Sequence, residues 1–513
     1  MQSLFVLLRK ASSLLAACLI LGPTITSAQN QPPFGTDGLS LVEAVRYTVA
    51  NETSIKIEES QVEMARGALQ SATGEFDITL GTELKTEEDD TPFSEPDVLS
   101  TGHAHQQTRT YSLNQNAKKT FRFGTEIDTS IGIERSENRF PEDSPVNDNG
   151  IFSFTVTQPL LQGFGVEATE AYEASQRELY EAEQYTLQQT VSQKIHEMVI
   201  AYWNYRGAKS KVTTYKKTIK NIEETLDKLQ QLIDGGEKPA SDLNHYMANL
   251  AIKKIDLLSA QQELFSAYQT LAIAMGVPYT QHIDIPTSLE EFPTVDTPPL
   301  PPTSQWLTDL AFSNRCDLKA LDKDLAAAKY QKNASLDDMR PELDLALNLK
   351  YSDVVKGSYE EDSTSISALL SYDFPVYNDS AAGEAAQAMA SLNKIRYEIE
   401  GLKRRISSEV NNAVDTLATY SNILQQYEEI LDLNRQRVKN ERIQYTLGNS
   451  NLVIVIEVEN NLITSQIDLI DSKTKVSNAL INLRYVTGTI LDSKQEIYTI
   501  IRSNLTTIPS KLL

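Results

Sequence analysis

The stretch VTQPLLQGFGVEA, residues 156–168, decides between two kinds of fold. Gly163 and Gly165 fit the G-x-G-x-x-[G/A] pattern of a dinucleotide-binding loop that joins a strand to a helix. That loop belongs to a compact β-α-β unit, in which a strand returns within about 30 residues. Here the helical pattern continues for about 67 residues and then turns into a second helix. We therefore interpret the glycines as the point where a strand turns into a helix, with Pro159 ending the strand pairing.

The N-terminus predicts export. Residues 1–28 carry two basic residues, Arg9 and Lys10, followed by an apolar run to Leu21 and small residues up to Ala28. This is the layout of a secretory signal peptide. A competing interpretation is a lipoprotein cleavage box that ends at Cys18 and would lipidate that cysteine. The apolar run continues past Cys18, which favours ordinary cleavage near Ala28, and the protein is exported in either case.

Composition limits the remaining classes of function. The chain has 513 residues, a net charge of −23, a pI near 4.8 and only two cysteines, Cys18 and Cys316. Binding of nucleic acid is not expected, because phosphate contacts need clustered Lys and Arg. After the signal, no apolar run reaches the roughly 18–20 residues of a membrane-spanning helix. An exported chain of this kind that spans a membrane must do so as a closed β-barrel.

Catalytic motifs are missing. His196 and Glu197 would begin a zinc-protease motif, but Ile200 stands where the second histidine is needed. The five histidines do not cluster at metal-ligand spacing, and Cys316 has no motif around it. We therefore expect no catalytic residue, cofactor or metal, and a function that comes from the shape and charge of a pore.

Six segments alternate apolar and polar residues with period two, which is typical of strands with two different faces. A water-soluble β-sandwich with one wet face would show the same alternation, but it does not explain the long helical segments in the rest of the chain. The predicted strands are 76–84, 109–117 (the weakest), 121–134, 152–156, 343–351 and 366–374.

The segments between these strands differ in length at the two ends of the predicted sheet. Residues 86–106 and 135–150 are polar and acidic, and we interpret them as long loops, whereas residues 118–120 ("KKT") are interpreted as a short turn. Long loops at one end and short turns at the other are typical of outer-membrane barrels.

Two segments predict helices of unusual length, 166–233 and 381–447. Their apolar residues step by 3 and 4 over many turns, as in a coiled-coil seam. At about 1.5 Å per residue, each helix extends about 100 Å, which no ordinary globular core requires. Each seam alone would equally suit a plain dimeric coiled coil.

The chain repeats itself. Each half is predicted to contain a helix, strands, a long helix, a glycine turn and a return helix, and the first half carries about 47 extra residues in its strand region. These residues correspond to an additional hairpin around 107–134. Matching positions are Gly236 and Gly448, 212 residues apart, Pro159 and Pro375, 216 apart, and Asn51 and Asn314, 263 apart.

This order of elements, the duplication, "TQPLLQGFG", "DFPVYN" and the two glycine turns together resemble the TolC family of outer-membrane efflux proteins, over about 39–490. The resemblance implies an α+β membrane protein, in which a homotrimer forms one outer-membrane β-barrel that continues as a long periplasmic α-helical barrel. The implied divisions are the signal peptide 1–28, a first repeat 29–291 (strands 76–158, long helix 166–233, tip turn 234–240, return helix 241–276), a proline-rich linker 292–305, a second repeat 306–490 (strands 343–374, long helix 381–447, tip turn 448–451, return helix 452–488) and a tail 491–513.

The resemblance also implies site residues, at the periplasmic entrance where the helix tips meet. Tyr445 and Asp242 match a tyrosine and an aspartate that link neighbouring tips, and Glu457 falls on one of two acidic rings of the pore. Ile454 stands at the other ring and Ser450 where an arginine is expected, so that part of the closure should be weaker. The remaining predicted positions are the tip glycines Gly235, Gly236 and Gly448, and the strand-to-helix residues Pro159, Gly163, Gly165 and Pro375.

The function implied by the resemblance is passive exit through the outer membrane for a tripartite efflux or type I secretion system. Its partners would be a periplasmic adaptor, an inner-membrane pump and outer-membrane lipid, in a Gram-negative-type bacterium. The alternative is a periplasmic structural coiled-coil protein with a soluble β-domain. Four strands per chain would give a trimer twelve, and the additional hairpin would raise this to eighteen if it enters the wall.

Overall fold

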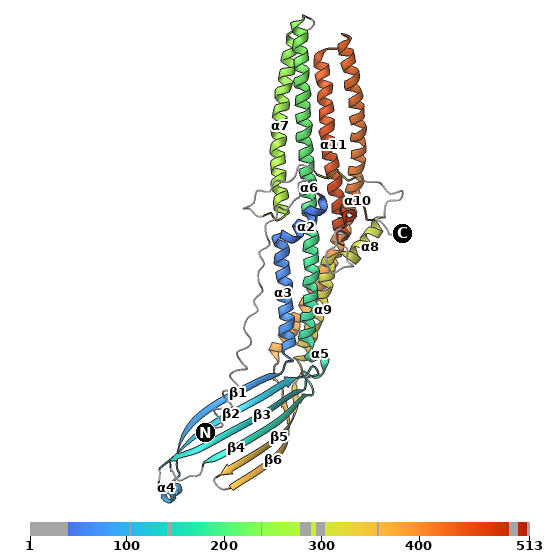
Figure 1. Cartoon of the computed structure of the whole chain (residues 1–513). Helices are drawn as coiled ribbons and strands as arrows, with labels where there is room; N and C mark the ends of the chain where they lie inside the picture. Colours follow the sequence, from blue (N-terminus) through green and yellow to red (C-terminus); the bar gives the residue numbers. More distant parts are fainter. Residues whose placement is uncertain are drawn as a thin grey trace.

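The structure is a computed structural model that describes residues 39–102, 104–140, 146–236, 239–277, 289–293, 303–356, 359–491 and 501–509. The expected signal peptide with Cys18, and most of the expected linker and tail, lie outside these residues. The molecule is elongated, with one sheet at one end and long helices extending from it (Figure 1).

The elements alternate between strands and helices twice along the chain. The helices are α2 (Leu41–Asn51), α3 (Thr53–Gly74), α4 (Glu95–Thr101), α5 (Val166–Thr169), α6 (Ala171–Asp234), α7 (Ser241–Ala274), α8 (Ser304–Asn314), α9 (Cys316–Asp337), α10 (Asp379–Thr446), α11 (Leu452–Val486) and α12 (Arg502–Thr506). The strands are β1 (Thr79–Pro92), β2 (His105–Thr120), β3 (Glu126–Phe140), β4 (Asn147–Pro159), β5 (Glu342–Lys356) and β6 (Tyr359–Asp373).

The described strands form one antiparallel sheet of six, in sequence order from β1 to β6. The additional hairpin is therefore part of this sheet, because β2 pairs with β1 and β3 pairs with β4. The segment 109–117, predicted as the weakest strand, lies inside β2, the longest strand of the sheet at 16 residues.

Register keeps most of the large apolar side chains of the sheet on one face, with Ile151, Val354 and Leu369 as exceptions. Ile131 pairs with Phe152, and Phe154 with Leu349, whereas the next residue along from Ile131, Ser130, pairs with Ser153. Directly opposed residues share a face, so one face is mainly apolar and the other mainly polar from β1 to β6. Large apolar side chains on this face remain exposed in the single chain, including Leu80 at 81% and Ile366 at 83%.

Three expectations about the strands were wrong. Residues 118–120, interpreted as a short turn, are the paired end of β2. Residue 121 does not start a strand, because Phe121 to Thr125 form the turn between β2 and β3, where Gly124 takes a φ of +96°. The acidic segments 86–106 and 135–150 are not long loops throughout, because β1 continues to Pro92 and β3 to Phe140. Backbone pairing extends past the apolar band, and polar side chains on both faces hide this extension from an alternation pattern.

The two long helices run through the helical part of the molecule (Figure 1). α6 has 64 residues and α10 has 68, and the shorter α3 and α7 lie end to end beside α6, as α9 and α11 lie beside α10. The predicted seams form much of the core, with Val191, Ile195 and Ile406 fully buried. No helix in the described part of the chain has the length and apolar character to cross a membrane.

Each half begins with two helices where one of about 35 residues was expected. The first pair is broken at Glu52 and the second at Arg315, positions 263 residues apart. Gly276 and Gly488, 212 apart, have φ values of +70° and +65°, and each packs its backbone against one of these breaks. In each half, the break between the two helices therefore makes room for the glycine that follows the return helix. The periodicity of the sequence does not show this contact.

Candidate functional site

The helix tips, far from the sheet, carry the predicted entrance residues (Figure 1). α6 and α7 are joined at Gly235 and Gly236, and α10 and α11 at Gly448. Gly236 and Gly448 adopt φ values of +76° and +79°. Glycine suits this left-handed conformation just after a helix end, because it has no side chain to clash.

Tyr445 and Asp242 meet within one chain. The Tyr445 hydroxyl, in the last turn of α10, donates a hydrogen bond of 3.3 Å to Asp242 Oδ2, in the first turn of α7. Burial, and next the neighbouring Asp242 carboxylate, raise the pKa of the Tyr445 hydroxyl above its usual value. The contact joins the two helical hairpins at their tips.

A second set of contacts, one helical turn away from the tips, was not predicted. Glu459 forms an ion pair with Arg442 at 2.6 Å and accepts a hydrogen bond of 3.5 Å from the Tyr246 hydroxyl. Tyr246 is four residues after Asp242, and Arg442 three before Tyr445, so each lies on the same helix face as a predicted residue. Same-face spacing was the signal that could have found them. Together these contacts bridge α7 of one hairpin to α10 and α11 of the other.

The other tip residues are placed differently. Glu457 is exposed on α11, and within the described residues it forms no hydrogen bond or ion pair. Ile454 is 38% exposed on the same helix. The Ser450 hydroxyl donates a short hydrogen bond to Glu441, so it ties down its own turn. The Glu457 carboxylate is thus exposed to solvent near the tips.

The two glycines of the Gly163–Gly165 turn at the other end use their backbone N–H groups inside the chain. The Gly163 N–H donates to Asp337 Oδ2 at 2.6 Å, and the Gly165 N–H to the Phe123 carbonyl at 3.3 Å. The φ values of +72° and +88° let the chain turn from the end of β4, at Pro159, into α5. The glycine N–H groups that would face a pyrophosphate are therefore already used inside the chain.

The second repeat makes the same transition without these glycines. Pro375 follows the end of β6, and Asn378 takes a left-handed φ of +43° just before α10. The Asn378 side-chain amide donates a hydrogen bond of 3.0 Å to the Met339 carbonyl, which connects this turn to the segment between α9 and β5.

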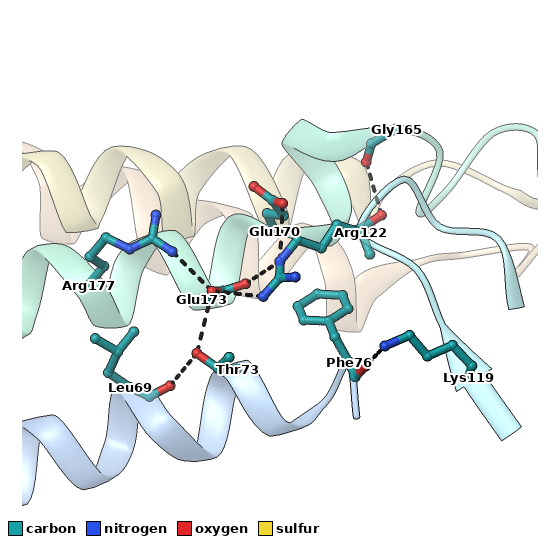
Figure 2. Close-up of polar contacts among 10 residues, drawn as sticks. Leu69, Thr73, Phe76, Lys119, Arg122, Gly165, Glu170, Glu173 and Arg177 are labelled. Carbon is teal, nitrogen blue, oxygen red and sulfur yellow. Dashed lines mark hydrogen bonds and ion pairs between the residues drawn. The ribbon is translucent and has the colours of Figure 1, made fainter. Parts of the chain in front are cut away.

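Beside the first transition lies a buried carboxylate, Glu173 of α6, which is 4% exposed (Figure 2). Arg122, from the turn between β2 and β3, donates two hydrogen bonds to it, at 2.9 and 3.2 Å. Arg177 donates a third at 3.0 Å, and the Thr73 hydroxyl of α3 a fourth at 3.4 Å. Glu173 thereby connects the sheet, α3 and α6.

Glu173 should make folding stability depend on pH. The hydrogen bonds from Arg122 are the largest cause that lowers the pKa of this carboxyl below its ordinary value of 4.5. Its stabilisation is therefore present above about pH 4.5 and is lost as the pH falls through the folded-state pKa. We expect Glu173→Gln to lower the free energy of unfolding by about 1–2 kcal/mol at pH 7, since solvent screens the half-exposed arginines.

The measurement is the thermal unfolding midpoint of both proteins in detergent at pH 7 and pH 4. The difference between them should shrink at the lower pH. Glu63→Gln is the control, because Glu63 forms only an exposed 3.6 Å pair with Arg66. A difference that stays constant between the two pH values would contradict the assignment.

Across the part of the chain that the structure describes, no group of three or more His, Cys, Asp and Glu side chains could hold a metal ion. His196 is instead partly buried and stacked on Tyr485, with ring centroids 4.6 Å apart. Burial is the main cause that lowers the pKa of His196 to about 4. The His196 imidazole is therefore uncharged at neutral pH and has a packing role.

Comparison with known proteins gives a consistent result. A family model described as "Outer membrane efflux protein" matches residues 102–277 and 307–489. No curated protein matches significantly. Similar solved structures include a Pseudomonas aeruginosa membrane protein (17% identity, TM-score 0.64, 87% of this chain and 92% of that one), the Campylobacter jejuni CmeC outer membrane channel (12%, 0.62, 89% and 87%) and the open state of the Neisseria gonorrhoeae MtrE outer membrane channel (13%, 0.61, 87% and 88%).

A sheet with one exposed apolar face, continued by helices of about 100 Å, is the architecture of an outer-membrane channel with a long helical duct. The chain belongs to the outer membrane efflux protein family, whose model covers more than half of it. The predicted resemblance to the TolC family is confirmed, and the protein is an efflux channel of the outer membrane. The family consists of channels rather than enzymes, which favours the channel over a structural coiled-coil protein.

Proposed function

We propose that three copies of this chain close into one duct that gives passive exit through the outer membrane. The observation that carries the proposal is the sheet, which has one exposed apolar face and two edges. Within the described residues the outer edges of β1 and β6 pair with no strand. A sheet in lipid must be closed, so β6 of each copy would pair with β1 of the next, which gives an eighteen-stranded barrel.

The helices support the same arrangement. Four helices per chain lie beside each other at each level, α3, α6, α9 and α10 near the sheet and α6, α7, α10 and α11 near the tips (Figure 1). Three copies would form a helical barrel that continues the β-barrel into the periplasm. A periplasmic adaptor and an inner-membrane pump would deliver the cargo of an efflux or type I secretion system to its tips.

Purified protein in planar lipid bilayers tests this function. The expected result is discrete channels, and outer membranes should release the protein only with detergent. Full extraction by salt or alkali, together with an absence of channel activity, would contradict the proposal.

The tips would form a gate in which Asp242 and Glu457 have different roles. We expect Asp242→Ala to raise single-channel conductance several-fold, because it removes the hydrogen bond from Tyr445 in each of three chains. A hydrogen bond to a charged acceptor contributes about 1.5–3 kcal/mol, and three of them are enough to change the dominant state.

Glu457→Gln is the matched comparison, because Glu457 is exposed and takes no part in the contacts between hairpins that the described residues show. It should leave conductance near the unmodified value and weaken cation selectivity, since it removes charge from the entrance. If Glu457→Gln opens the channel while Asp242→Ala conducts like the unmodified protein, the two roles are assigned the wrong way round.

A further inference from the structure

The β2–β3 hairpin is the one part of the described sheet that does not lead into a helix at the helical end of the molecule. β1 follows α3 and β5 follows α9, while β4 leads into α5 and β6 into α10. β2 and β3 are instead joined to each other by the turn at 121–125. Each chain therefore places six strands above four helices.

This turn is docked on the helices. The Arg122 guanidinium binds the buried Glu173 carboxylate of α6 and lies 4.8 Å from the centre of the Phe76 ring, just after α3 (Figure 2). Lys119 donates a 2.6 Å hydrogen bond to the Phe76 carbonyl. A Cβ on Gly124 would lie 2.4 Å from the Gly163 carbonyl oxygen, so the turn and the strand-to-helix transition are in close contact. These contacts hold the hairpin in line with the rest of the sheet.

The faces of the hairpin also continue those of the sheet. Across the apolar face, Leu84 of β1 pairs with Leu113, which pairs with Ile133. On the polar face, the Asn114 side chain lies over Gly132, where a Cβ would approach its Oδ1 to 2.4 Å. The same register of lipid-facing and opposite faces thus passes through β2 and β3 without interruption.

Six strands per chain change the width of a closed barrel. Strands about 4.8 Å apart and tilted by about 40° each occupy about 6.3 Å of circumference. Eighteen strands then give about 110 Å, and twelve would give about 75 Å. A ring of twelve helices packed about 9–10 Å apart measures about 110–120 Å, which is close to the value for eighteen strands.

We propose that the docked β2–β3 hairpin widens the outer-membrane exit, so that solutes too bulky for a barrel of twelve strands pass the membrane. This proposal rests on the trimeric channel proposed above. Arg122 acts here as a positioning residue through Glu173.

Removal of the hairpin is the direct test. Deletion of residues 105–140 leaves β1 next to β4 in a compatible register, because Leu80 pairs with Ala117, which pairs with Thr129, which pairs with Phe154. Leu80 would then meet Phe154, and both belong to the apolar face. The deletion should therefore produce a narrower barrel with the same lipid-facing surface.

The width can be measured from outside the cell, independently of the gate. A cysteine is placed at Ser367, on the polar face of β6, in a Cys316→Ser background, and intact cells are treated with polymer-linked maleimides of increasing size. Ala368→Cys, the next residue on the apolar face, is the control. With about 5 Å of side chain on each wall, reagents near 20 Å across should label Ser367→Cys in the full chain and be excluded from the deletion variant.

Equal size limits in the two proteins would overturn the inference and leave the channel intact. If a small maleimide labels Ser367→Cys and Ala368→Cys alike, no closed wall exists, and the proposed channel itself fails. Should the deletion variant not reach the outer membrane, electron cryomicroscopy of the full-length trimer decides instead. Eighteen strands in the wall would support the inference, and residues 105–140 lying outside it would overturn it.

Discussion

Gly276→Ala is expected to lower the free energy of unfolding by about 3 kcal/mol or more, which should appear as a clear fall in the thermal unfolding midpoint. Gly276 has a φ of +70°, which costs about 1–2 kcal/mol for any residue with a side chain. A Cβ there would also lie 2.7 Å from Glu52 Cα and 2.9 Å from the Asn51 carbonyl carbon. Both are backbone atoms, so the break between α2 and α3 would have to move.

Gly236→Ala separates these two effects. Gly236 has a similar φ of +76°, but among the described residues no atom beyond its chain neighbours lies within 4 Å of the position a Cβ would take. Only the cost of the left-handed backbone should remain, about 1–2 kcal/mol, at a tip where the loss is local. Equal falls in the unfolding midpoint for the two variants, measured by helical circular dichroism, would show that the close packing at Gly276 contributes nothing.

Ile131→Arg is expected to prevent most of the protein from assembling in the outer membrane. Ile131 lies on the exposed apolar face of β3, where it is 57% exposed in the single chain. An arginine near the middle of a bilayer costs about 2–4 kcal/mol, and a trimer would carry three of them. The yield of detergent-resistant oligomer from outer membranes measures the effect.

Ser130→Arg is the matched control, because Ser130 is the preceding residue and belongs to the polar face. Its side chain would point away from lipid, and the oligomer yield should stay close to that of the unmodified protein. Similar losses for both variants would mean that the two faces of the sheet are not divided between lipid and lumen.

The sequence predicted the elements whose periodicity comes from burial. The seams of α6 and α10, such as Val191 and Ile406, repeat every three to four residues because one side of each helix packs on its neighbours. The apolar alternation of β3 predicted its central part for the corresponding reason. The ends of β1 and β3 could not be predicted, since past the apolar band both faces are polar and only backbone pairing continues.

The candidate sites divide in the same way. The residues Gly236, Gly448, Gly163 and Gly165 could be chosen from sequence because a left-handed turn restricts the residue type. The Tyr445–Asp242 contact came from a family resemblance. Glu173 and Arg122 lie 51 residues apart, and one acidic residue among 70 carries no local mark of burial. Long-range partners of this kind become visible only when the fold brings them together.

Electron cryomicroscopy of the full-length protein in lipid nanodiscs tests the central claim most directly. We expect a threefold particle in which the sheets of three chains close around one lumen within the lipid disc. Long helices should continue that lumen on one side, with the tips bearing Tyr445 and Asp242 farthest from the membrane. Particles with one or two chains, or with an open sheet lying outside the lipid, would contradict the account.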